Sequence, residues 1–144
     1  MKSRLTTITM KIALLFFLLL SAKFVTAAEE PSIPALKAIE KFGSITIADG
    51  SSFFTFSKDG SFHSGPLSQS GRTFEGHWKA DGLKFTVIAT LGWLNGLSKF
   101  DDYRRIVFVI YDVRKKPSAP HPNLVDAYFL IDELVEIPKP AAAN

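Results

Sequence analysis

The three histidines of this chain, His63, His77 and His121, are the side chains best suited to bind a metal ion or to transfer a proton near neutral pH. His63 and His77 are expected on neighbouring strands, where they could meet across the ladder and form a metal patch with Glu75. Glu75 and His77 both fall on the predicted solvent face, however, and His121 lies in an exposed Pro-His-Pro segment. Ordinary surface polarity is therefore the favoured interpretation, and we predict no metal site.

The densest charge cluster is Asp101-Asp102 followed by Arg104-Arg105, which offers two carboxylates for a hard cation and two guanidinium groups for an anion. Calcium loops space their oxygen ligands over about a dozen residues, and that pattern is missing here. A solvated turn with local ion pairs at the start of a strand is the favoured interpretation. The basic triplet Arg114–Lys116 could contact an acidic polymer, but a solubilising loop explains three charges as well.

The sequence carries no recognisable catalytic motif. It has no cysteine, no Gly-x-Ser-x-Gly nucleophile motif and no glycine-rich phosphate loop. Its glutamates at positions 40, 75, 133 and 136 have no spacing that predicts a shared site. We therefore expect a protein that is not an enzyme and that has no cofactor.

Two Asp-Gly turns organise the elements that must position these residues. Asp59-Gly60 and Asp81-Gly82 each separate two short segments with alternating side chains, residues 53–56 and 61–64 for the first turn and residues 73–79 and 83–87 for the second. Asp-Gly tolerates the positive φ angles of tight hairpin turns, so each turn predicts a β-hairpin. Alternation places Phe74, Gly76 and Trp78 on a buried face, and Gly76 predicts room for a bulky neighbour or a bend in the sheet.

Three further strands and one helix complete the predicted fold. The strands are expected at 44–48, 105–113 and 124–137, the last with a bend near Asp132-Glu133. The helix is expected from Ile33 to Phe42, with Ser32 as its cap, Gly43 as its stop and a buried face of Ile33, Leu36, Ile39 and Phe42.

These elements predict a mainly β protein. Residues 105–113 are apolar on both faces, so the helix or the Leu91–Phe100 segment is expected to cover the outer face. Leu91–Asp102 itself is expected to be a compact, self-packed connection or a short helical turn. About seven strands without βαβ spacing predict a small antiparallel meander that closes into a barrel or forms a strongly bent sheet, with one short N-terminal helix. A two-sheet β-sandwich is the alternative.

Residues 1–28 have the layout of a secretory signal peptide. Lys2 and Arg4 precede an apolar run from Ile12 to Leu20, and small residues follow up to Ala28, so we expect cleavage after Ala27 or Ala28. The run is shorter than the roughly 20 residues that a spanning helix needs, which disfavours a retained membrane anchor. The sequence thus predicts a secreted or periplasmic protein with a single β domain at 29–137 and a disordered tail at 138–144.

Removal of the signal peptide changes the charge of the chain. Four of the 17 basic residues lie before residue 29 and none of the 14 acidic residues does, so the remainder carries 13 basic and 14 acidic residues. The positive net charge of the full chain therefore belongs to the signal peptide. A nucleic-acid partner loses its main electrostatic support, and none is expected.

Residues 54–62 and 76–82 resemble small bacterial lipocalin-like domains of secreted proteins. A strand, an Asp-Gly turn, a strand, a Gly-x-Trp motif (here Gly76-His77-Trp78) and a second Asp-Gly turn recur in that group. The match covers about a third of the chain after the signal peptide. True lipocalins carry Gly-x-Trp on the first strand, whereas here it falls on the fourth predicted strand. The resemblance implies a cup that holds a small apolar molecule, or a binding module without chemistry.

The inward aromatic residues are the candidate ligand-binding residues: Phe54, Phe56, Phe62, Trp78, Phe85, Trp93 and Phe108. We expect them to line an apolar pocket of several hundred Å³, with Leu91–Phe100 as its rim. The predicted function is a secreted binding module for a small apolar ligand. The alternative is a protein–protein interaction domain that uses a sheet edge or the 91–102 segment as its docking surface.

Overall fold

The computed structural model describes residues 30–66, 71–93, 102–116 and 123–141. The predicted signal peptide and part of the predicted tail lie outside these residues. The elements are, in chain order, α2 (Ala35–Phe42), β1 (Ser44–Asp49), β2 (Ser52–Ser57), β3 (Ser61–Pro66), β4 (Arg72–Asp81), β5 (Lys84–Trp93), β6 (Tyr103–Lys115) and β7 (Leu124–Ile137). Within the described ranges, no helix has the length and apolar character needed to cross a membrane.

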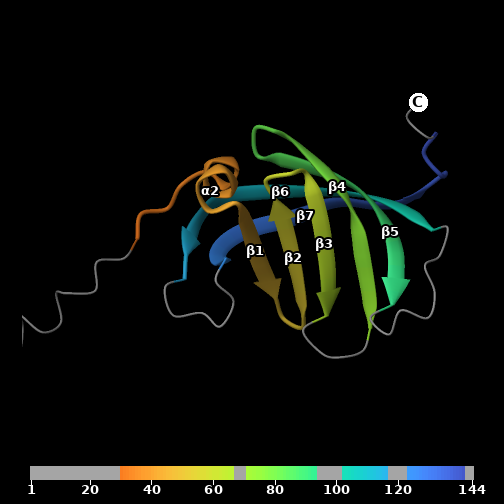
Figure 1. Ribbon diagram of the computed structural model, residues 1–144, viewed down its shortest axis with the longest axis horizontal. Coiled ribbons are helices and arrows are strands. Elements are labelled where there is room, and N and C mark those ends of the chain that lie inside the picture. The colour runs from red at the N-terminus through yellow and green to blue at the C-terminus, as the bar shows by residue number, and fades with distance from the viewer. Residues whose placement is uncertain (1–29, 67–70, 94–101, 117–122, 142–144) are drawn as a thin grey trace, which may run out of the picture. The chain divides into compact units, whose positions relative to one another are not determined.

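The seven strands form a closed barrel in chain order, which confirms the predicted fold class. Each strand pairs antiparallel with the next, and a short parallel contact joins β1 to β7 at Thr46–Leu124 and Ile47–Val125. Strands β1–β5 run nearly vertically in Figure 1, and β6 and β7 cross behind them. The sandwich alternative is not adopted. Gly60 and Gly82 have positive φ angles of 88° and 60°, as the two Asp-Gly hairpin turns predicted.

The helix differs from its prediction at its start and in its buried face. Ile33 forms a two-way backbone bridge with Val113, with N···O distances of 2.9 and 2.8 Å, so the helix begins only after Pro34 and Ser32 does not cap it. The buried residues are Ala35, Ala38 and Ile39, whereas Leu36 is 39% exposed. The predicted positions were three residues apart throughout, and that spacing drifts around a helix of 3.6 residues per turn. The helix does end at Gly43, whose φ angle is 83°.

Strand β5 is longer at its C-terminal end than predicted. Phe85, Val87, Ala89 and Leu91 are all buried, so the inward alternation continues through Leu91 rather than breaking there. Leu83, the first residue of the predicted strand at 83–87, lies in the turn before β5 and is 44% exposed. The rest of the predicted 91–102 connection, residues 94–101, lies outside the described residues.

Strand β7 contains the predicted irregularity near Asp132. Val107 of β6 pairs with Glu133 and the next residue, Phe108, pairs with Ile131, so Asp132 is an extra residue on β7. Such a β-bulge bends the strand and reverses which side chains face inward beyond it.

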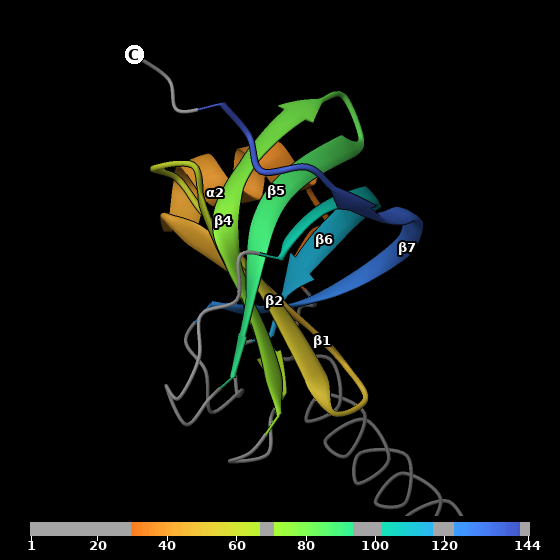
Figure 2. The ribbon, with the colours of Figure 1, turned by 90° about the vertical axis from the view of Figure 1, so that its right-hand side faces the viewer.

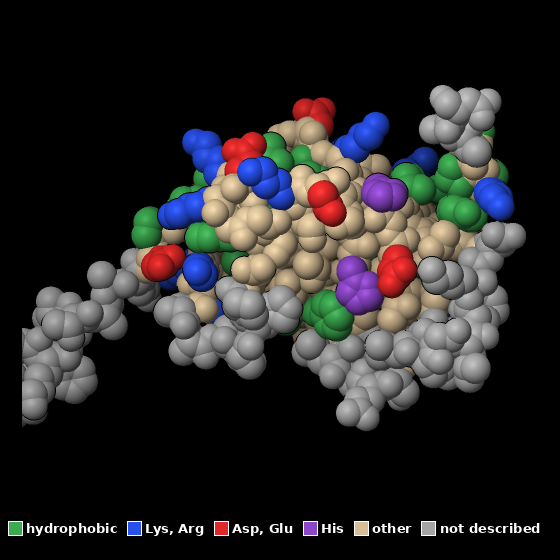
Figure 3. Space-filling model, in the orientation of Figure 1, with side chains coloured by type: hydrophobic (Ala, Val, Ile, Leu, Met, Phe, Trp, Pro, Cys, Tyr) green, Lys and Arg blue, Asp and Glu red, His purple; other side chains and the backbone are tan. Residues whose placement is uncertain are grey.

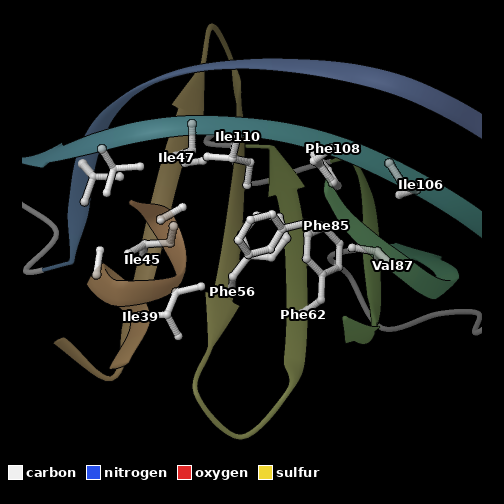
Figure 4. Packing of buried hydrophobic residues seen from close by; sticks show 14 of the residues in the cluster. Ile39, Ile45, Ile47, Phe56, Phe62, Phe85, Val87, Ile106, Phe108 and Ile110 are labelled. Atoms are coloured by element: carbon white, nitrogen blue, oxygen red, sulfur yellow. The ribbon is translucent and has the colours of Figure 1, made fainter. Parts of the chain in front are cut away.

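The core fills the barrel between α2 and the aromatic residues of β2, β3, β5 and β6. Figure 4 shows Ile39 of the helix beside Ile45, and the rings of Phe56, Phe62 and Phe108 further along. Phe56 makes edge-to-face contacts with Phe62, Phe85 and Phe108 at centroid distances of 5.2–5.4 Å. The helix belongs to the same core cluster as Ile110 and Val113. It therefore packs into one end of the barrel. The expectation that the helix covers the outer face of β6 was wrong.

Candidate functional site

An apolar pocket of about 320 Å³ lies in the barrel, and no residue of α2 lines it. We call it the apolar pocket, and its lining residues are Ser52, Phe54, Ser64, Gly65, Arg72, Phe74, Ile106, Phe108, Ile131 and Leu134. They come from β2, β3 and β4 on one side and from β6 and β7 on the other. Figure 2 shows the backbone of these strands from another direction, with the labelled parts of β6 and β7 to the right of β4 and β5.

The strand register explains why a pocket forms at this level of the barrel. Phe54, Ser64 and Phe74 are paired in one row across β2, β3 and β4. The next row towards the helix pairs Phe56 with Phe62, and both rings are buried. Ser64 is thus a small side chain where the neighbouring row has a phenylalanine, and the difference in side-chain volume leaves space beside it.

The bulge at Asp132 supplies the opposite wall. Ile131 pairs with Phe108 and Leu134 pairs with Ile106, so both apolar side chains face the inside of the barrel. Without the extra residue, strict alternation would place Glu133 inside and Leu134 outside. Ile131 and Leu134 are nevertheless 45% and 56% exposed, because the pocket in front of them is open.

The predicted ligand-binding residues separate into two groups. Phe54 and Phe108 line the apolar pocket. Phe56, Phe62 and Phe85 are buried in the core and do not reach it.

Of the two tryptophans, Trp78 does not line the apolar pocket. The Trp78 ring packs against the core phenylalanines, and its indole N–H donates to the Ser57 carbonyl at 2.9 Å. The backbone of Trp93 pairs with Arg72, but its side chain lies outside the described part of the chain.

Sequence reasoning missed Ile106, Ile131 and Leu134 as pocket residues, and also the opening left by Ser64. The alternation of the β4 segment did place Phe74 inside. Ser64, a small polar residue at an inward position of β3, was a signal in the sequence that space is left at this level of the barrel. Leu134 had no such signal, because its inward position depends on the bulge.

The histidines do not form the metal patch that their strands made conceivable. His63 pairs with Glu75, with 3.6 Å between Nδ1 and Oε1, while His77 pairs with Ser61. The two histidines therefore occupy different rows, and Figure 3 shows two separate histidine side chains on the outer face. The described residues contain no group of three or more His, Cys, Asp and Glu side chains placed to hold a metal ion.

The charge cluster at the start of β6 forms ion pairs rather than an open anion clamp. Arg104 pairs with Asp102, and Arg105 donates two hydrogen bonds, of 2.9 and 2.8 Å, to Glu133 across the ladder. These hydrogen bonds hold the pKa of Glu133 below its ordinary value. Asp101 lies outside the described residues.

The basic triplet at the end of β6 also has local partners. Lys116 pairs with Asp126 at 3.0 Å, and the Lys115 ammonium lies 4.9 Å from the centre of the Phe42 ring. Local contacts of this kind are typical of a solvated surface.

Comparison with known proteins gives no relative: no protein-family model, no curated protein and no solved structure matches this chain. The functional argument therefore rests on the geometry of the site alone.

Proposed function

We propose that this protein is a secreted, non-catalytic binding module that holds a small apolar molecule in the apolar pocket. The observation that supports the proposal is the exposure of Ile131 and Leu134, two large side chains on the inner face of the barrel. Apolar area buried by a ligand contributes roughly 25 cal/mol per Å², so covering these side chains would favour binding.

The composition of the pocket supports an apolar ligand. Seven of its ten lining residues are apolar or glycine, and the others are Ser52, Ser64 and Arg72. Ligand sites typically combine apolar walls with a few polar groups that fix the orientation of the ligand. Its volume, about 320 Å³, is at the small end of the usual range for such sites.

Strand β7 itself supplies a matched pair of variants to test the proposal. Leu134 faces the pocket and is 56% exposed, whereas Leu130 of the same strand is 46% exposed and does not line it. A neutral dye, N-phenyl-1-naphthylamine, should bind the purified protein at one saturable site. Leu134→Gln should weaken binding about tenfold, since an apolar contact is lost, and Leu130→Gln should leave it unchanged. Absence of saturable binding, or an equal effect of both variants, would refute the proposal.

A second candidate function is protein docking at the edge of β7. Its pairing with β1 is confined to Leu124 and Val125, and from Asp126 to Ile137 the described residues provide no strand on that side. Open edges of this kind accept an added strand. Tyr128 on this segment is 67% exposed, and its ring centre lies 5.3 Å from that of Tyr111, with the two rings tilted by 40°. If the edge is used, analytical ultracentrifugation or pull-down should detect a complex that Tyr128→Lys weakens while dye binding stays intact.

A further inference from the structure

Among the described residues that line the apolar pocket, one side chain is charged. Arg72 is the first residue of β4, and no carboxylate is among the lining residues. The ends of β2 and β3 pair at Ser52 and Pro66, and β4 begins at the same end of the barrel, so Ser52 and Arg72 both lie at the mouth. The walls beyond them are formed by Phe54, Phe74 and the side chains of β6 and β7. In the part of the chain that the structure describes, the mouth of the pocket therefore carries the Arg72 guanidinium and the Ser52 hydroxyl, and the interior is apolar.

We infer that the ligand is an anionic amphiphile: its acidic group lies against Arg72 and its apolar chain lies against Phe74, Ile131 and Leu134. This inference rests on the proposed function and specifies the class of ligand. A guanidinium group stays charged at all physiological pH values and matches planar and tetrahedral oxyanions with paired N–H donors. Arg72 has five such donors, so it can bind an oxyanion in addition to any contact within the protein.

The volume of the pocket limits the length of the apolar chain. About 320 Å³ corresponds to roughly ten water molecules at about 30 Å³ each. A medium-length chain fits this space, whereas a long-chain lipid would extend well outside it. The exposed mouth leaves the acidic group partly hydrated, so the desolvation cost of the ion pair with Arg72 stays moderate.

The test compares decanoate, decanol and decyltrimethylammonium, which share one chain length and differ in the charge of the head group. Each is titrated against the purified protein carrying the neutral dye, the two charged compounds below their micelle concentrations and decanol below its solubility limit. Decanoate should displace the dye with about tenfold higher affinity than decanol, and the cation should bind most weakly. Added salt should narrow the difference, because the mouth is exposed.

Variants of Arg72 separate charge recognition from packing. Arg72→Gln should lower the affinity for decanoate about tenfold, towards that of decanol, while the affinity for decanol falls much less, and Arg72→Lys should retain part of the preference. Lys79→Gln is the matched control: it removes a positive charge from the exposed part of the same strand, and it should change neither affinity. Decyl phosphate and decyl sulfate, tested in parallel, show which oxyanion the mouth prefers.

Each outcome bears on one of the two proposals. Equal binding of decanoate and decanol would overturn the anionic ligand and leave the apolar-ligand function standing. An equal loss of both ligands in Arg72→Gln would overturn the role of the charge, since it would show that Arg72 contributes only packing. Failure of all three amphiphiles and of the dye to bind would overturn both proposals.

Discussion

Of the described glycines, Gly76 leaves the least room for a side chain, and the substitution Gly76→Ala tests how tightly β4 and β5 pack there. A Cβ atom at Gly76 would lie 1.9 Å from the Ile88 carbonyl oxygen and 2.6 Å from the Cα atom of Ala89. Both are backbone atoms of β5, so no side chain can rotate away and the two strands must separate. Overpacking in a well-packed interior costs about 1–3 kcal/mol, and a backbone clash belongs at the upper end of that range.

We therefore expect Gly76→Ala to lower the free energy of unfolding by about 3 kcal/mol and the melting temperature by about 10 °C. Urea and thermal denaturation, followed by circular dichroism, measure both quantities. Gly65→Ala is the control, because a Cβ atom there would lie 3.4 Å from Phe53 and Thr73 side-chain atoms, which is ordinary contact. It should change stability by less than about 0.5 kcal/mol. If the two variants were equally stable, the close approach at Gly76 would not exist in solution.

Three further predictions concern the core and two hydrogen-bonded carboxylates. Phe56→Ala should cost about 3–5 kcal/mol in urea denaturation, because Phe56 is fully buried among other rings; a loss below about 1 kcal/mol would contradict a filled core. Hydrogen bonds from Ser61 lower the pKa of Asp59, so the wild type should be more stable than Asp59→Asn above about pH 4 and should lose this advantage as the pH falls through the lowered pKa. Thermal denaturation between pH 6 and pH 2 measures the difference in stability, and a difference that does not change with pH would contradict the prediction. Replacing Arg105 by Gln should raise the pKa of Glu133 towards its ordinary value, as measured by NMR titration; an unchanged value would show that this ion pair does not persist.

Local signals in the sequence were sufficient to predict the architecture. Each Asp-Gly turn lies between two alternating segments, and a tight turn joins its strands antiparallel whatever the rest of the chain does. Consecutive hairpins then allow few arrangements other than a meander. The helix end was predictable for the same reason, since Gly43 provides its own stop. Its start was not, because Ile33 is held by Val113, which is 80 positions later in the chain.

The pocket was predictable only in part, because its position depends on register between distant strands. Alternation identified the inward aromatic residues, but it did not show which of them have large neighbours in the same row. Phe56 and Phe62 face each other and fill their level, whereas Phe54 and Phe74 face Ser64 and leave space. A list of inward residues therefore predicts a core, and pairing between strands decides where that core ends.

The bulge at Asp132 links the charges on the outside of the barrel to the wall of the pocket inside it. Beyond this residue Glu133 faces outward, where Arg105 of β6 donates two hydrogen bonds to it, and Leu134 faces inward. Slipping β7 by one residue would separate the ion pair and move a carboxylate into an apolar interior, at the cost of desolvating it. The outward ion pair and the inward leucine thus favour the same register. This register thus keeps Glu133 off the lining, where Arg72 is the one charged group among the described residues, and the inference of an anionic ligand depends on that arrangement.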